Sequence, residues 1–168
     1  MIFIYTDFGG THSTALAAAY HLNKLPTDRK LTKEEILNVE YFNKLKTEDM
    51  GKIIFHGIDE NGNPVYTIGC GASKVVVPAM KHLGEILQKH YQSHEKIIFS
   101  NTSPTVPLPM TFGGLFSRRF HIDFIGVPLL VWGAKLSCDN VQRLVSYTKE
   151  AGRLTNDYVV ILDNETFK

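Results

Sequence analysis

Short apolar runs alternate with helix-forming stretches along most of this chain. Apolar runs of strand length that hold few charges are typical of strands covered on both faces of a sheet. We predict strands at residues 2–5, 52–57, 65–69, 96–100, 124–132 and 158–162. The alternation favours an α/β fold, a three-layer sandwich with a mostly parallel sheet, one β-hairpin and helices on both faces.

Helix signals separate these runs, and they predict helices at residues 13–22, 75–91, 111–120 and 140–151. The first helix is rich in alanine, which has the strongest helix propensity. Pro78 falls in the first turn of the second helix, where its missing N–H costs little. We expect Ser137 or Asp139 to cap the last helix and Gly152 to close it.

Two connecting segments have signals of their own. Residues 27–50 are polar and charged, and we predict a helical insertion over one face, because Thr32 and Glu35 have the spacing of a capping box. Asn61-Gly62 lies between two predicted strands and supplies the positive φ angles of a hairpin turn. No linker or internal repeat divides the chain, so residues 1–168 are predicted to form a single domain.

Composition narrows the possible partners. Lys plus Arg is 18 and Asp plus Glu is 17, a balance that argues against bulk nucleic-acid binding. No apolar run has the length of a membrane span, and the first run is too short for a signal peptide. We therefore expect a cytoplasmic protein without a membrane partner. Cys70, Cys138 and the histidines lack metal-type spacing, so the sequence predicts free thiols and no metal site, and it identifies no cofactor.

The segment after the first strand is the main candidate site. It reads Asp7-Phe8-Gly9-Gly10-Thr11-His12-Ser13-Thr14 and leads into the first predicted helix. Free backbone N–H groups and the positive end of the helix dipole meet at such a point and favour an anion. The segment loosely resembles a phosphate-binding loop but lacks its lysine, so nucleoside triphosphate hydrolysis by the usual route is not expected. The alternative is a plain turn with capping hydroxyls. The predicted ligand-binding residues here are Asp7, Gly9, Gly10, Thr11, His12, Ser13 and Thr14.

His12 is the candidate catalytic residue. At the start of a helix, the dipole lowers the pKa of an imidazole and favours its neutral form. A neutral histidine donates to a ligand oxygen or acts as a base near neutral pH. The alternative is an exposed His12 that only helps to cap the helix.

Three further segments are candidates because they offer hydrogen-bond donors or positive charge near the same end of the sheet. They supply Ser73, Lys74, Asn101, Thr102, Ser103, Arg118 and Arg119. The paired arginines can hold a phosphate or carboxylate with two hydrogen bonds. Each segment also has a plain explanation: a helix start with a solvated lysine, a proline-rich loop, and a solvated helix end.

Several motifs of the first 70 residues form a recognisable set. They are Tyr5, Gly9–Ser13, Ala17–Ala19 with His21-Leu22, Leu25-Pro26, Thr32–Ile36, Gly51–Ile54 with His56-Gly57, and the hairpin with Val65–Gly69. This set resembles a bacterial family that is catalogued only as a domain of unknown function. The resemblance implies a compact soluble protein of bacterial or phage type. It implies no activity and no catalytic residues.

The leading hypothesis is that the turn at Gly9–Thr14 binds a small anionic molecule, either phosphorylated or nucleotide-like. The second is a hydrolase or transferase that uses His12 as acid or base. The third is an interaction module in which residues 27–50 dock a partner protein. The sequence leaves a homo-oligomer open.

Overall fold

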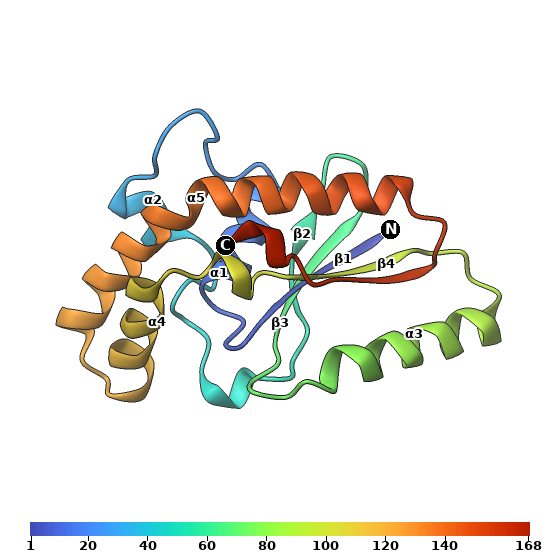
Figure 1. The fold of residues 1–168 in the computed structure, drawn as a ribbon, viewed down its shortest axis with the longest axis horizontal. Helices are drawn as coiled ribbons and strands as arrows, with labels where there is room; N and C mark the ends of the chain where they lie inside the picture. Colours follow the sequence, from blue (N-terminus) through green and yellow to red (C-terminus); the bar gives the residue numbers. More distant parts are fainter.

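A computed structural model describes residues 1–168 and contains one five-stranded sheet (Figure 1). Its strands are β1 (Ile2–Asp7), β2 (Ile54–Ile58), β3 (Pro64–Gly69), β4 (Ile97–Asn101) and β5 (Val159–Leu162). They lie in the order β2-β3-β1-β4-β5. All neighbours are parallel except β2, which is antiparallel to β3. The predicted α/β class, mainly parallel sheet and single hairpin are confirmed.

The helices are α1 (Ser13–His21), α2 (Lys33–Asn38), α3 (Val76–Tyr91), α4 (Leu108–Gly114) and α5 (Asp123–Leu154). A π-helical segment, Leu115–Arg119, continues α4, and short 3₁₀ turns occupy three other places, Thr47–Asp49, Ser103–Thr105 and Glu165–Phe167. None of these helices combines the length and apolar character needed to cross a membrane.

Side chains on the two faces of the sheet enter different clusters. Successive residues of a strand point to opposite faces. Tyr5 of β1 joins a cluster of 22 buried residues with α1 and α5. Its neighbour Ile4 joins a smaller cluster that packs against Val76 and Met80 of α3. In Figure 1, α5 accordingly runs along one side of the sheet and α3 along the other.

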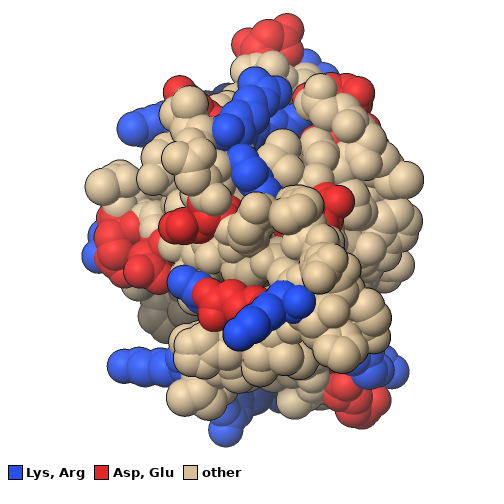
Figure 2. Space-filling model, turned by 90° about the vertical axis from the view of Figure 1, so that its right-hand side faces the viewer, with Lys and Arg blue, Asp and Glu red and all other residues tan.

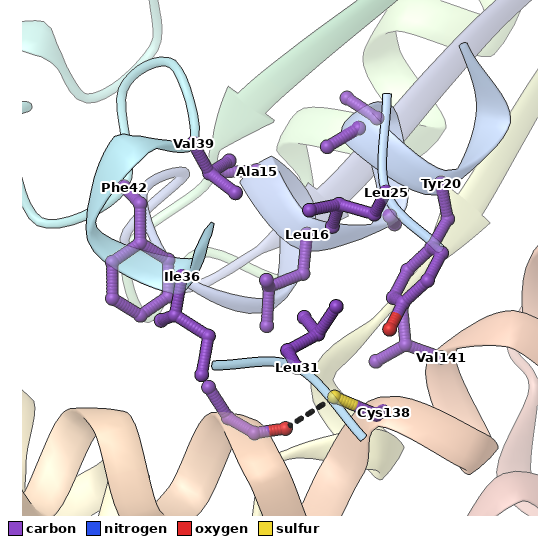
Figure 3. Packing of buried hydrophobic residues seen from close by; sticks show 14 of the residues in the cluster. Ala15, Leu16, Tyr20, Leu25, Leu31, Ile36, Val39, Phe42, Cys138 and Val141 are labelled. Carbon is purple, nitrogen blue, oxygen red and sulfur yellow. Dashed lines mark hydrogen bonds between the residues drawn. The ribbon is translucent and has the colours of Figure 1, made fainter. Parts of the chain in front are cut away.

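The larger cluster surrounds α1, which is buried along its whole length. Its alanines let α1 fit between the sheet and α5, while Leu16 and Tyr20 reach outward into the cluster (Figure 3). On α5, the Cys138 thiol is buried and donates to the Ala134 carbonyl at 3.0 Å. The small residues of α1 thus allow side chains of the sheet, α1 and α5 to share one core.

The insertion at residues 27–50 also contributes to this core. Thr32 Oγ1 accepts from the Glu35 amide at 3.2 Å, and Glu35 Oε2 accepts from the Thr32 amide at 2.7 Å. The predicted capping box is therefore confirmed. Ile36 and Phe42 are buried in the same cluster as side chains of α1 and α5, so the insertion contributes to this core.

The predicted strand at residues 124–132 is wrong, because these residues form the first part of α5, a continuous 32-residue helix that includes 140–151. Ser137 and Asp139 therefore cap nothing, and Gly152 lies inside the helix. Residues 124–132 are apolar because this part of α5 is covered on two sides. Gly126 and Gly133 pack against α4 and the π-helical segment, where an added Cβ would lie 2.6 Å from a backbone nitrogen, and other positions face the core.

The hairpin turn differs from the prediction in one respect. Gly62 has a φ of 80°, whereas Asn61 does not adopt a positive φ. The Asp59 side chain organises the turn instead, since its Oδ1 accepts from the amides of Asn61 at 2.9 Å and Asn63 at 2.8 Å. This Asx-type arrangement replaces the second positive φ angle.

Candidate functional site

The candidate site lies at the carboxyl ends of β1, β3 and β4. The chain leaves β1 for α1 on one face of the sheet and leaves β3 for α3 on the other. In open α/β sheets, ligands bind where neighbouring connections part in this way. The turn after β1 therefore occupies the expected position for a site.

Glycines bring the turns after β1 and β3 into direct backbone contact. Gly10 has a φ of 70°, and a Cβ there would lie 2.6 Å from the Gly69 nitrogen. The Cys70 amide donates to the Asp7 carbonyl at 2.8 Å, and the Gly71 amide to the Phe8 carbonyl at 2.9 Å. These glycines therefore permit the two turns to approach each other.

Asp7 occupies the N-terminal end of α1 with its own carboxylate. The Gly10 amide donates to Asp7 Oδ1, and the Ser13 hydroxyl donates to Asp7 Oδ2 at 2.8 Å. Burial raises the pKa of Asp7, although these hydrogen bonds act in the opposite direction. The negative charge that favours this helix end is thus supplied from within the chain.

The hydroxyl groups of the turn bond mainly within the protein. Thr11 Oγ1 donates to the Tyr41 carbonyl at 2.6 Å and anchors the insertion to the turn. Ser13 Oγ lies 2.8 Å from Thr102 Oγ1, which joins the turn to the end of β4 as the sequence suggests. Thr14 Oγ1 is buried and has no partner.

His12 is oriented by a directed chain of hydrogen bonds. Its Nε2 lies 3.2 Å from Asn43 Oδ1. The Asn43 amide donates in turn to Ser117 Oγ at 2.9 Å, and that hydroxyl donates to Asp123. Because a carbonyl oxygen only accepts, Nε2 carries the proton, and Nδ1, which makes no hydrogen bond within the chain, keeps its lone pair.

The environment of His12 keeps it neutral. Burial lowers its pKa to about 4, the Asn43 hydrogen bond opposes this, and the charge of Arg118 lowers it further. The direction agrees with the sequence prediction, but burial is the leading cause. The His12 side chain makes no capping hydrogen bond, so His12 does not act through its ring as a helix cap.

Arg118 lies beside His12 and holds a charge that no carboxylate neutralises directly. Its Nη1 donates to the Asn43 carbonyl at 3.2 Å. Arg29, which pairs with Glu35, is the only arginine of the chain that forms an ion pair. Arg118 is half-buried, and burial lowers its pKa. Its remaining N–H groups are free to bind an anion.

The other predicted site residues lie apart from His12 and Arg118. Ser73 and Lys74 are exposed before α3, and Arg119 is exposed at the end of the π-helical segment. Asn101 donates to the Asp163 carbonyl at 3.4 Å and accepts from the Ser103 amide at 3.0 Å. None of these five side chains forms a hydrogen bond with the turn at residues 7–14.

Three residues of the hydrogen-bond chain that orients His12 were not predicted from the sequence: Asn43, Ser117 and Asp123. They lie far from His12 along the chain, and no motif links them. A weak signal is present at Asn43, whose φ of 54° is one that asparagine tolerates better than most residues.

Cys70 and the other acidic and basic side chains form no further candidate site. Cys70 is half-buried, and burial together with the charge of Asp7 raises its pKa. No group of three or more His, Cys, Asp and Glu side chains is placed to hold a metal ion. On the face shown in Figure 2, basic and acidic side chains are interspersed, so that face carries no extended basic patch.

Comparison with known proteins identifies a family without a known activity. No curated protein and no solved structure matches the chain. Residues 2–150 match the family described as "Protein of unknown function (DUF3189)", so the similarity extends well beyond the first 70 residues. With most of its length covered, including the turn after β1, His12 and Arg118, the chain belongs to the DUF3189 family.

Proposed function

We propose that this protein binds a small phosphorylated or nucleotide-like ligand at the carboxyl edge of the sheet. The observation that carries the proposal is Arg118, a half-buried guanidinium without an ion pair, beside the neutral ring of His12. Guanidinium groups bind phosphate and carboxylate with paired hydrogen bonds, and partial burial strengthens such bonds. A neutral imidazole beside the guanidinium adds a hydrogen-bonding group without competing charge.

The turn after β1 has a supporting role in this proposal. Asp7 already accepts from the Gly10 amide and the Ser13 hydroxyl. We therefore assign the first contacts of the ligand anion to Arg118 and His12. In the three-layer arrangement that we infer for the domain, the closed turn supplies a rigid wall at the point where the connections part.

Catalysis by His12, in a hydrolase or transferase, is the second candidate. The observation that favours it is the protonated Nε2, which leaves the Nδ1 lone pair free to accept a proton. The hydrogen bonds that lead from His12 to Asp123 hold the ring in one orientation, as a third group does for the base of a catalytic triad. The docking hypothesis for residues 27–50 gains no such support, since Ile36 and Phe42 are buried in the core.

Calorimetric titration with a panel of phosphometabolites and nucleotides tests the binding proposal. We expect at least one member to bind, and Arg118→Ala to weaken that binding by about tenfold or more. The matched control is Arg119→Ala, which removes the same charge from the neighbouring exposed position. The proposal fails if no panel member binds, or if both variants weaken binding equally.

Incubation of the bound panel member with the protein separates binding from catalysis. Turnover that His12→Gln abolishes, with binding retained, supports the enzyme. Recovery of the ligand unchanged supports binding alone. Mass spectrometry of small molecules released by heating the purified protein supplies candidate ligands that the panel lacks.

A further inference from the structure

A hollow of about 300 Å³ opens between α1, α2 and β2. Its volume is at the lower end of the range for small-molecule pockets. One wall is apolar and comes from α1, the segment that follows it, and the end of α2, through Ala15, Ala19, Leu25 and Val39. Figure 3 shows Ala15 and Val39 next to each other within the buried cluster. These four residues also belong to the buried core, and the partly exposed Leu22 and Pro26 complete the apolar lining.

A β-bulge places a histidine in the opposite wall. The register of β2 against β3 shifts between Phe55 and Gly57. Gly57 has a φ of 144°, and a Cβ there would lie 3.2 Å from Leu22 Cδ1. The bulge therefore brings β2 close to the end of α1 and turns His56 into the pocket lining, where it is only 6% exposed.

The hydrogen bonds of His56 leave one ring nitrogen with a proton to donate. Its Nε2 lies 2.9 Å from Thr67 Oγ1. Thr67 is fully buried, and its hydroxyl has no other acceptor in the chain, so the hydroxyl donates to Nε2. The neutral ring then carries its proton on Nδ1, which makes no hydrogen bond within the protein. Burial lowers the pKa of His56 to about 4, so the ring stays neutral near pH 7.

The charged groups at the rim are one lysine and two glutamates. Lys24 Nζ donates to the His56 carbonyl at 3.0 Å and lies 3.6 Å from Glu40. Glu35 is already paired with Arg29 and bonded to the Thr32 amide. The rim beside His56 therefore holds one ammonium group, which is fixed by the backbone of β2 and is shared with the Glu40 carboxylate.

We propose that this pocket binds a small carboxylic acid with a compact apolar body. The apolar part lies against Leu22, Leu25 and Pro26, and the carboxylate accepts from His56 Nδ1 and from Lys24. The site shares no residue with Arg118 and His12, so it stands or falls independently of the function proposed above.

Titration of the ¹⁵N-labelled protein with 3-methylbutanoate tests this site. We expect amide shifts at Ala15, Ala19 and His56 with millimolar affinity, and at least about tenfold weaker binding of the isosteric alcohol 3-methylbutan-1-ol. Lys24→Met should weaken carboxylate binding by about tenfold. The matched control, Lys33→Met, alters an exposed lysine outside the pocket and should bind as the unaltered protein does.

Three results would overturn the proposal. The first is an absence of shifts at the pocket residues up to about 20 mM 3-methylbutanoate. The second is equal binding of the acid and the alcohol, and the third is equal weakening by the two lysine variants. Thermal unfolding of both variants confirms that each is folded before its binding is compared.

Discussion

Gly10 and Gly69 lie so close together that neither position has room for a side chain. A Cβ on Gly10 would lie 2.6 Å from the Gly69 nitrogen, and a Cβ on Gly69 would lie 2.9 Å from the Gly10 nitrogen. Contacts under 3.0 Å are not found for real Cβ atoms, so the backbone would have to move. The contact fixes the turn before α1 against the end of β3, and with it the position of His12.

Gly69→Ala should therefore destabilise the protein by about 3 kcal/mol, because overpacking against backbone cannot be relieved by a rotamer change. Urea unfolding measures the change. The matched control is Gly9→Ala, whose Cβ would meet only Thr11 Cγ2 at 3.8 Å and whose cost should be small. Equal stability of the two variants would contradict the close contact.

Asp7→Asn should become more stable relative to the unaltered protein as the pH rises through and above the ordinary range in which an aspartate ionises. Burial raises the pKa of Asp7, so the folded protein binds its proton more tightly than the unfolded chain does. The stability that this proton contributes is present at low pH and is lost as Asp7 ionises. Asparagine cannot ionise and keeps an oxygen for the Gly10 amide.

Urea unfolding of both proteins across this pH range gives the comparison. A difference in free energy of unfolding that stays constant or falls with rising pH would show that Asp7 is not protonated more readily in the folded state.

Acid should destabilise the protein between about pH 6.5 and pH 4. Burial is the first cause that lowers the pKa values of His12, His21 and His56, each to about 4. In this range the unfolded chain binds protons at these histidines and the folded protein does not, so the free energy of unfolding falls as pH falls. Each histidine contributes a slope of up to about 1.4 kcal/mol per pH unit.

His21→Gln should reduce that slope by the share of one histidine, whatever it does to stability at neutral pH. Urea unfolding at a series of pH values measures the slope. His82→Gln alters an exposed histidine and serves as the control. An unchanged slope in His21→Gln would mean that His21 takes up a proton in the folded protein as it does in the unfolded chain.

The tautomer of His12 is directly measurable. Long-range ¹H–¹⁵N correlation spectra should show a protonated Nε2 and an unprotonated Nδ1 at neutral pH, because Asn43 Oδ1 can only accept. Asn43→Ala removes this acceptor, and the ring should then exchange between tautomers. A protonated Nδ1 in the unaltered protein would contradict the chain that leads to Asp123.

The elements that were predicted well depend on neighbouring residues. The capping box needs only Thr32 and Glu35, three positions apart, and both hydrogen bonds form. Pro78 lies in the first turn of α3 as predicted. Such signals predict the structure well because the interacting groups are already close together in the sequence.

The first part of α5 shows where local signals are insufficient. An apolar run of this length fits a strand covered on both faces or a helix buried on several sides. Contact with α4 through Gly126 and Gly133 favours the helix over the strand, and no pattern along the chain indicates either contact. The segment is helical because α4 and the core cover it from two directions.

The sequence by itself determined where the candidate site lies, because a strand, a glycine turn and an alanine-rich helix follow one another within 21 residues. It could not determine which groups there remain available. Gly10 lies against Gly69, and His12 bonds to Asn43 and lies near Arg118, because folding brings the insertion, β3 and the π-helical segment to one edge. Local propensities set the turn, whereas the partners of its side chains depend on contacts between distant segments.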